Sequence, residues 1–214
     1  ASMLLGVATG ASAIDFKAKG QWLMGFAGGE NSLVNKYRAP GATSNTKQNS
    51  DDKFAAQQRV RLQLDAVASE SLSGTVFFEI GNQVWGQEKT GGALGADGNS
   101  VIKVKRAYID WMVPQTDLKF RMGIQGVTLP NKAGGSAIMD TDAAGITASY
   151  QFNENVGLTA LWARPANDNY VGGKDNANYL DNMDLFALMV PVKLDGFEIT
   201  PWAMYGMKGK NTLT

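Results

Sequence analysis

The chain has 214 residues, with 20 Lys plus Arg balanced by 20 Asp plus Glu, and it contains neither Cys nor His. A net charge of zero argues against a nucleic-acid partner, because phosphate binding requires basic surfaces. The lack of Cys excludes disulfides and thiolate metal sites, and the lack of His removes the commonest general base and metal ligand. We therefore expect a protein that is not an enzyme and that holds no cofactor or metal.

Residues 1–13 have the features of the end of a secretory signal peptide. Met3 to Val7 are mostly apolar, and Ala11-Ser12-Ala13 fits the small-x-small pattern of a cleavage site. The alternative is a short disordered N-terminus. The pattern predicts a signal-peptide remnant at 1–13, export through a cleaved signal peptide, and a mature protein that begins at Ile14, with residues 14–214 forming the barrel part described below.

No stretch of the chain reaches the roughly 20 consecutive apolar residues that a membrane-spanning helix needs. The strands of a membrane barrel need only about 10 residues each, and their polarity alternates. Alternation of this kind predicts nine strands, at 14–26, 53–69, 74–86, 105–113, 118–125, 146–152, 156–164, 182–192 and 197–207.

The alternation separates large apolar side chains from charged ones. In the strand at 105–113, Ile109 and Trp111 share a face, and Arg106 and Asp110 share the other. The strands at 53–69 and 118–125 follow the same pattern. Large apolar groups on one face and long charged groups on the other predict a sheet with lipid outside and water inside.

The predicted loops alternate in length, with long loops after the first, third, fifth and seventh strands and short turns after the others. The loop at 127–143 contains Pro130, Gly134, Gly135, Asp140 and Asp142. Long loops at one rim and short turns at the other are the layout of outer-membrane barrels. A soluble sandwich with the same inner face would have to pair every buried arginine. We therefore expect an all-β fold, an antiparallel transmembrane β-barrel.

The chain resembles the general bacterial outer-membrane porins, most closely the homotrimeric porins of sulfate-reducing bacteria, over residues 4–214. The segments that carry the resemblance are 50–53, Arg59-Val-Arg-Leu-Gln-Leu-Asp65, Lys105-Arg-Ala-Tyr108, Met122-Gly-Ile-Gln125 and Asp184-Leu-Phe-Ala-Leu188. Such porins have about 16 strands. The resemblance implies a porin-type barrel of which about nine strands are present, so that this chain is an N-terminal fragment, and it implies a homotrimer when full length.

In general porins the long loop after the fifth strand folds into the channel and narrows it, and residues 127–143 occupy that position. Asn131 stands where some relatives carry an acid, so the acidic side of the constriction would come from Asp140 and Asp142. The resemblance, together with the charged faces, predicts these pore-lining or constriction residues: Lys17, Lys19, Arg59, Arg61, Arg106, Tyr108, Asp110, Lys119, Arg121, Asp140 and Asp142.

The expected function is an outer-membrane diffusion channel for small hydrophilic solutes and ions, with outer-membrane lipid as its other partner. On the first five strands, seven basic and four acidic residues share the expected inner face, which predicts a weak preference for anions. One alternative is a structural or adhesive barrel with a plugged lumen. A less favoured one is an outer-membrane enzyme, since a nucleophile–His arrangement is missing from this chain.

Overall fold

The structure is a computed structural model that describes residues 14–29, 36–37, 46–47, 53–95, 102–131, 134–167 and 181–212. The expected signal-peptide remnant at 1–13 lies outside these residues. Over the described ranges the fold is all-β apart from the 3-10 helix η1 (Glu88–Thr90) and the 3-10 conformation of Asp181. Within them, no helix is long and apolar enough to cross a membrane.

Nine strands form one antiparallel sheet, whose order follows the chain: β1-β4-β5-β6-β7-β8-β9-β10-β13. Each of the nine predicted strands overlaps one strand of this sheet, with β1 and β13 at the two ends of the order. Their bounds are β1 (Asp15–Gly29), β4 (Lys53–Ser69), β5 (Leu72–Val84), β6 (Ile102–Met112), β7 (Leu118–Thr128), β8 (Asp140–Gln151), β9 (Gly157–Asn167), β10 (Asn182–Met189) and β13 (Trp202–Lys208). Two small hairpins are separate: β2 (Lys36–Tyr37) with β3 (Thr46–Lys47), and β11 (Val192–Leu194) with β12 (Phe197–Ile199).

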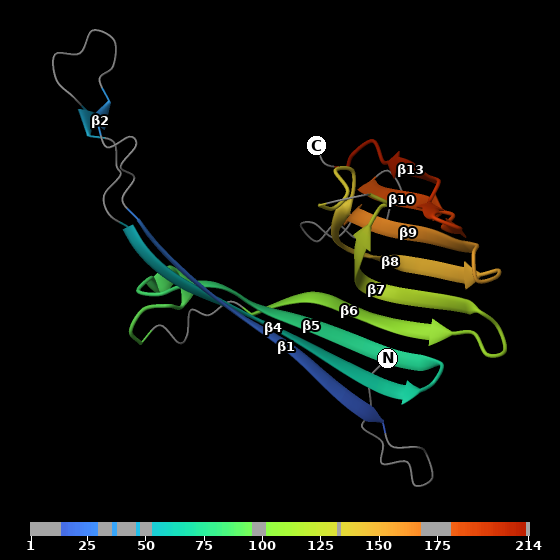
Figure 1. Ribbon diagram of the computed structural model, residues 1–214, viewed down its shortest axis with the longest axis horizontal. Coiled ribbons are helices and arrows are strands. Elements are labelled where there is room, and N and C mark those ends of the chain that lie inside the picture. The colour runs from blue at the N-terminus through green and yellow to red at the C-terminus, as the bar shows by residue number, and fades with distance from the viewer. Residues whose placement is uncertain are drawn as a thin grey trace. The chain divides into compact units, whose positions relative to one another are not determined.

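The chain divides into two compact units, one of residues 1–18, 63–77 and 104–214 and the other of residues 19–62 and 78–103. The first unit contains β6 to β10 and β13, of which β8, β9, β10 and β13 lie side by side (Figure 1). Here the two faces of the sheet differ in composition, because directly paired residues of neighbouring strands project on the same side.

One face of the first unit is apolar across six strands. A continuous row of direct partners runs from β6 to β13 through Ile109, Met122, Ile146, Trp162, Phe186 and Tyr205. The neighbouring row on this face consists of Trp111, Phe120, Ala148, Ala160, Leu188 and Ala203. Side chains of this face remain exposed, including Ile109 at 49%, Phe186 at 43% and Tyr205 at 67%. Monomeric soluble proteins rarely expose so large a contiguous apolar surface.

The opposite face of the same unit changes character along the sheet. Its matching row begins with Asp110 and Arg121, continues through Thr147, and ends with Leu161, Ala187 and Met204. The apolar part of this face forms the core of the unit. Leu161 and Ala187 are buried there together with Val127, Leu129, Met139 and Ala163.

The predicted loop at 127–143 is wrong in its bounds. Strand β7 continues to Thr128 and β8 begins at Asp140, and the ladder runs without interruption from Leu118↔Tyr150 to Thr128↔Asp140. Asp140 and Asp142 therefore lie on a strand, not in a loop. The sequence from Asp140 to Gly145 contains no large apolar residue, so its alternation could not be recognised without its partner strand.

The last two predicted strands are also corrected, and proline explains the difference. Strand β10 ends at Met189, before Pro191, and the predicted strand at 197–207 is divided into β12 and β13 around Pro201. Proline has no N–H to donate to a ladder, but its carbonyl still accepts. The Val190 N–H donates to the Pro201 oxygen at 2.9 Å, and the Gly157 N–H donates to the Pro191 oxygen at 3.0 Å.

Strand β9 passes through Pro165, where the sequence predicted a loop. The pairing of β9 with β10 shifts between Met183 and Leu185, so Arg164 and Pro165 together lie opposite Asp184. Such a bulge admits proline into a strand, because the bulged residue need not donate to the ladder.

The second unit contains most of β1 and β4 and the end of β5. Large apolar side chains remain exposed here too, with Trp22 at 65%, Phe26 at 60% and Phe54 at 75%. The rings of Phe26 and Trp85 meet edge to face with their centroids 5.6 Å apart. Aromatic side chains near the ends of strands are typical of membrane barrels.

Candidate functional site

Each of three carboxylates in the sheet contacts two basic side chains. The first is Glu79 of the second unit, whose Oε2 lies 2.8 Å from Arg61 Nε and 4.0 Å from Arg59 Nη1. Arg59 also donates from Nε to the side-chain oxygen of Asn82 at 2.7 Å. Arg59 and Arg61 lie on β4, where alternation places them on the face opposite Leu62, and Glu79 and Asn82 lie on β5.

The second carboxylate is Asp110 on β6, in the first unit. Arg121 binds both of its oxygens, with Nε 2.7 Å and Nη2 2.8 Å away, and Lys119 Nζ lies 3.1 Å from Oδ2. The Arg121 guanidinium also stacks over the Tyr108 ring, 4.1 Å from its centroid. A bidentate pair that is also stacked fixes the arginine more firmly than a single contact would.

The third carboxylate is Asp142 on β8. Arg106 Nε lies 2.6 Å from Oδ1, and Lys105 Nζ lies 3.7 Å from Oδ2. The Arg106 guanidinium is also 5.8 Å from the centre of the Phe77 ring. Among the residues that the structure describes, each of the three clusters therefore contains two positive charges and one negative charge, an excess of one positive charge.

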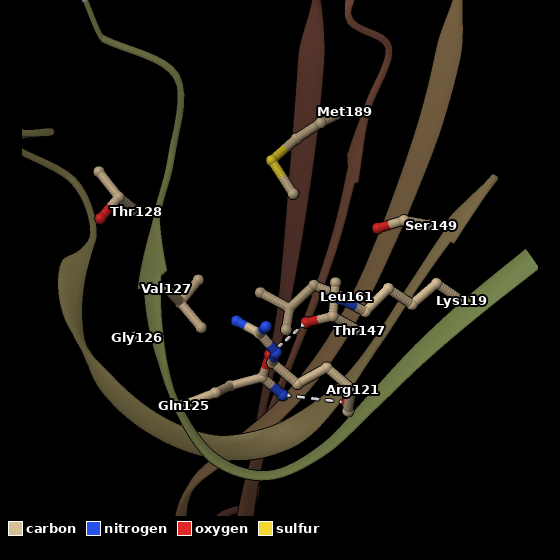
Figure 2. A pocket seen from close by; sticks show the side chains of 10 residues that line it. All are labelled: Lys119, Arg121, Gln125, Gly126, Val127, Thr128, Thr147, Ser149, Leu161 and Met189. Carbon is tan, nitrogen blue, oxygen red and sulfur yellow. Dashed lines mark hydrogen bonds between the residues drawn. The ribbon is translucent and has the colours of Figure 1, made fainter. Parts of the chain in front are cut away.

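A cavity of about 330 Å³ opens beside the Asp110 cluster (Figure 2). Its wall combines two charged side chains with hydroxyls and apolar groups. The lining residues are Lys119, Arg121, Gln125, Gly126, Val127, Thr128, Thr147, Ser149, Leu161 and Met189. Figure 2 shows β7 bending around this space, so that Gln125 and Val127 lie on the inside of the bend.

Past the bend, the β7–β8 hairpin packs on the charged face. We refer to its end, residues 126–131 and 134–142, as the hairpin tip. Leu129 at the tip is fully buried and Met139 nearly so, and both pack in the core with Leu161 and Ala187. Because Leu161 and Ala187 are on the face of Arg121, the tip covers that face and not the exposed apolar one.

The structure brings together many of the residues predicted from the sequence. Tyr108, Asp110, Lys119 and Arg121 form one cluster, Arg106 meets Asp142, and Arg59 and Arg61 share Glu79. The remaining three lie outside these clusters. Lys17 and Lys19 are exposed on β1, where Lys17 Nζ is 3.5 Å from Asp15, and Asp140 accepts a hydrogen bond from the Thr128 hydroxyl at 2.9 Å.

Sequence reasoning missed two polar features. One is Gln125, which is 2% exposed and lines the cavity. The other lies on the apolar face, where Asp184 accepts hydrogen bonds from Trp162 Nε1 and Arg164 Nε, each at 2.8 Å. Gln125 could have been found, because it is four positions from Arg121 on the same strand and therefore shares its face. The Arg164–Asp184 pair had none, because the bulge between β9 and β10 aligns the two residues.

No protein-family model matches the chain, and no curated protein matches it.

Proposed function

We propose that the protein is a porin-type diffusion channel of the bacterial outer membrane, which passes small hydrophilic solutes and ions. The observation that carries the proposal is the opposition of the two faces in the first unit. The row from Ile109 to Tyr205 is apolar over six strands, and the row behind it begins with the Asp110–Arg121 ion pair. A sheet with lipid on one side and water on the other needs this arrangement.

The hairpin tip supports the same proposal. A diffusion channel needs a passage narrower than the barrel that contains it, and an element that folds onto the inner wall provides the narrowing. Leu129 and Met139 attach the tip to the face that carries Arg121, and Asp142 attaches it to Arg106. In the proposed channel, Lys119 and Arg121 then line the passage beside the tip.

The proposal extends to the whole barrel and its location. The sheet order begins at β1 and finishes at β13, and in a porin of about 16 strands each of these would pair with a further strand. We propose that the chain is the N-terminal part of such a barrel, that it is exported through a signal peptide, and that the full-length protein forms a homotrimer.

The proposed mechanism is passive and electrostatic. Solutes cross in water, and the charged clusters orient polar solutes while the passage excludes large ones. Because each cluster has one positive charge in excess, the clusters favour anions weakly over cations. No covalent step is involved.

Planar-bilayer recording of the purified full-length protein tests the proposal. We expect stepwise conductance increases that vary linearly with voltage and with salt concentration. A protein that inserts into lipid vesicles, as judged by protease protection, but conducts no current would contradict the channel. That result would favour the structural barrel with a plugged lumen, in which the hairpin tip closes the passage.

A further inference from the structure

Gln125 has an unusual position for a polar residue in a strand. Its side chain is almost fully buried, although it lies on the same face as the charged groups of Lys119 and Arg121. Its amide makes three hydrogen bonds: Nε2 donates to the oxygens of Arg121 at 3.2 Å and Gly145 at 3.1 Å, and Oε1 accepts from the Thr147 hydroxyl at 2.8 Å. Buried polar groups in proteins are normally satisfied in this way.

The bond to Arg121 shows what the side chain does. In an extended strand, residues four positions apart are separated by about 13 Å. A glutamine side chain reaches only about 5 Å from its Cα. The amide of Gln125 can therefore meet the Arg121 carbonyl only because β7 bends between the two residues, as Figure 2 shows.

The bend has a pivot midway between these residues. Gly123 has a φ of 129°, a conformation that residues with a side chain rarely adopt. A Cβ at this position would also overlap the carbonyl oxygen of Ala107 on β6. Gly123 thus permits the bend, and Gln125 spans it from the inside, joining the strand to β8 through Gly145 and Thr147.

We infer that Gln125 is a positioning residue that holds the hairpin tip over the charged face and so sets the width of the passage. The inference rests on the proposed channel. The tip follows directly after Gln125 in the chain, and Gly126, Val127 and Thr128 form the side of the cavity opposite Lys119 and Arg121 in Figure 2. Loss of these hydrogen bonds frees the bend at Gly123, where glycine fixes no angle, and the position of the tip then depends on the contacts of Leu129, Met139 and Asp142.

The test compares the full-length protein with two variants and a control. Gln125→Met keeps the length and volume of the side chain but removes all three hydrogen bonds. Thr147→Val removes only the hydroxyl that holds Oε1 and provides a test if Gln125→Met does not fold. Thr159→Val is the matched control, because its hydroxyl lies within 3.2 Å of Ser149 Oγ, away from the bend.

Hydrogen–deuterium exchange in detergent micelles measures how firmly the tip is held, because its amides exchange when the local structure opens. We expect peptides from the hairpin tip to exchange at least about tenfold faster in Gln125→Met, about threefold faster in Thr147→Val, and unchanged in Thr159→Val, since buried groups lose their partners only near the bend. Peptides from β9 and β10 should stay unchanged in all three. Unchanged tip exchange, or an equal increase in every strand, would overturn the positioning role.

Bilayer recording then separates the inference from the function on which it rests. We expect Gln125→Met to conduct with larger fluctuations of the open-channel current than the wild-type protein. If the wild-type protein does not conduct, the channel is refuted, and the exchange data still decide the positioning role. If both proteins conduct with the same fluctuations, Gln125 does not control the passage.

Discussion

Arg106 Nε on β6 lies 2.6 Å from Asp142 Oδ1 on β8, although β7 separates these strands in the sheet order. The contact spans the place where β7 bends, and it depends on Gly126. A Cβ on Gly126 would lie 2.6 Å from Arg106 Cζ, so the guanidinium occupies space that any other residue would fill. The pair thereby ties the hairpin tip to the strand that carries Asp110.

This contact should nevertheless contribute little to stability. The side chains of Arg106 and Asp142 are 44% and 23% exposed, and water screens such pairs. A double-mutant cycle with Arg106→Ala and Asp142→Ala, measured by urea unfolding of the full-length protein in vesicles, should give a coupling of about 0.2–1 kcal/mol. The bidentate Arg121–Asp110 pair serves as the comparison and should give the larger coupling energy. A coupling energy for Arg121–Asp110 below that for Arg106–Asp142 would contradict this ranking of the two pairs.

The apolar side of β4 should not tolerate charge if it meets lipid. Leu62 on β4 is 39% exposed, and Leu62→Arg should cost about 2–4 kcal/mol of unfolding free energy at mid-membrane depth. Its neighbour Gln63 projects to the other face, where it donates to Asp65 at 2.8 Å. Gln63→Arg is thus the matched control and should cost less than about 1 kcal/mol. Equal losses in unfolding titrations would mean that the faces are assigned wrongly.

Ion selectivity should follow the charge of the clusters. Removing two positive charges with Arg59→Ala plus Arg61→Ala should weaken the preference for anions, and removing the negative charge with Glu79→Gln should strengthen it. Reversal potentials across a salt gradient measure both changes. The differences should shrink at high salt, because the Debye length is only about 10 Å at 0.1 M. Shifts of the same sign in both variants would exclude this cluster as a determinant of selectivity.

The pivot of the hairpin should be intolerant of any side chain. Gly123→Ala combines a φ of 129° with overlap of the Ala107 oxygen, so we expect a loss of about 3 kcal/mol or more. Gly134→Ala is the control, since its φ of 76° is unfavourable but nothing lies within 4 Å, and it should cost about 1 kcal/mol. Thermal unfolding of the two variants gives the comparison, and equal melting temperatures would show that Gly123 is no pivot.

The main strands could be predicted because their signal is local. Alternation over 53–69 or 118–125 is visible without knowledge of any partner, and β4 has the predicted bounds. The end of β7 and the start of β8 were missed because Thr141 to Gly145 are small or polar and become a strand only through pairing with Gly123 to Val127. The strands break at Pro191 and Pro201 because proline has no N–H to donate, and this could be predicted. The hydrogen bonds that Val190 and Gly157 make to the proline oxygens could not, because they depend on the fold.

The charged residues could be assigned to a face but not to partners. Alternation placed Arg106, Arg121 and Asp110 together, and the Arg121–Asp110 pair follows once the β6–β7 register is known. The contact of Arg106 with Asp142 could not be predicted in this form, since it requires the bend of β7. Gln125 was unremarkable in the sequence because burial of a polar residue on a charged face is decided by backbone curvature.

The unbroken row of partners from Ile109 to Tyr205 also limits how this sequence can change in length. Because side chains alternate with a period of two, deletion of one residue in the middle of β8 would move the residues on one side of the deletion to the other face and turn hydroxyls such as those of Thr147 and Ser149 toward the apolar side. A two-residue deletion keeps each side chain on its face and shifts only the pairing of the strand along its axis. Changes in length within these strands should therefore occur in pairs of residues, and single-residue insertions should be confined to the connections.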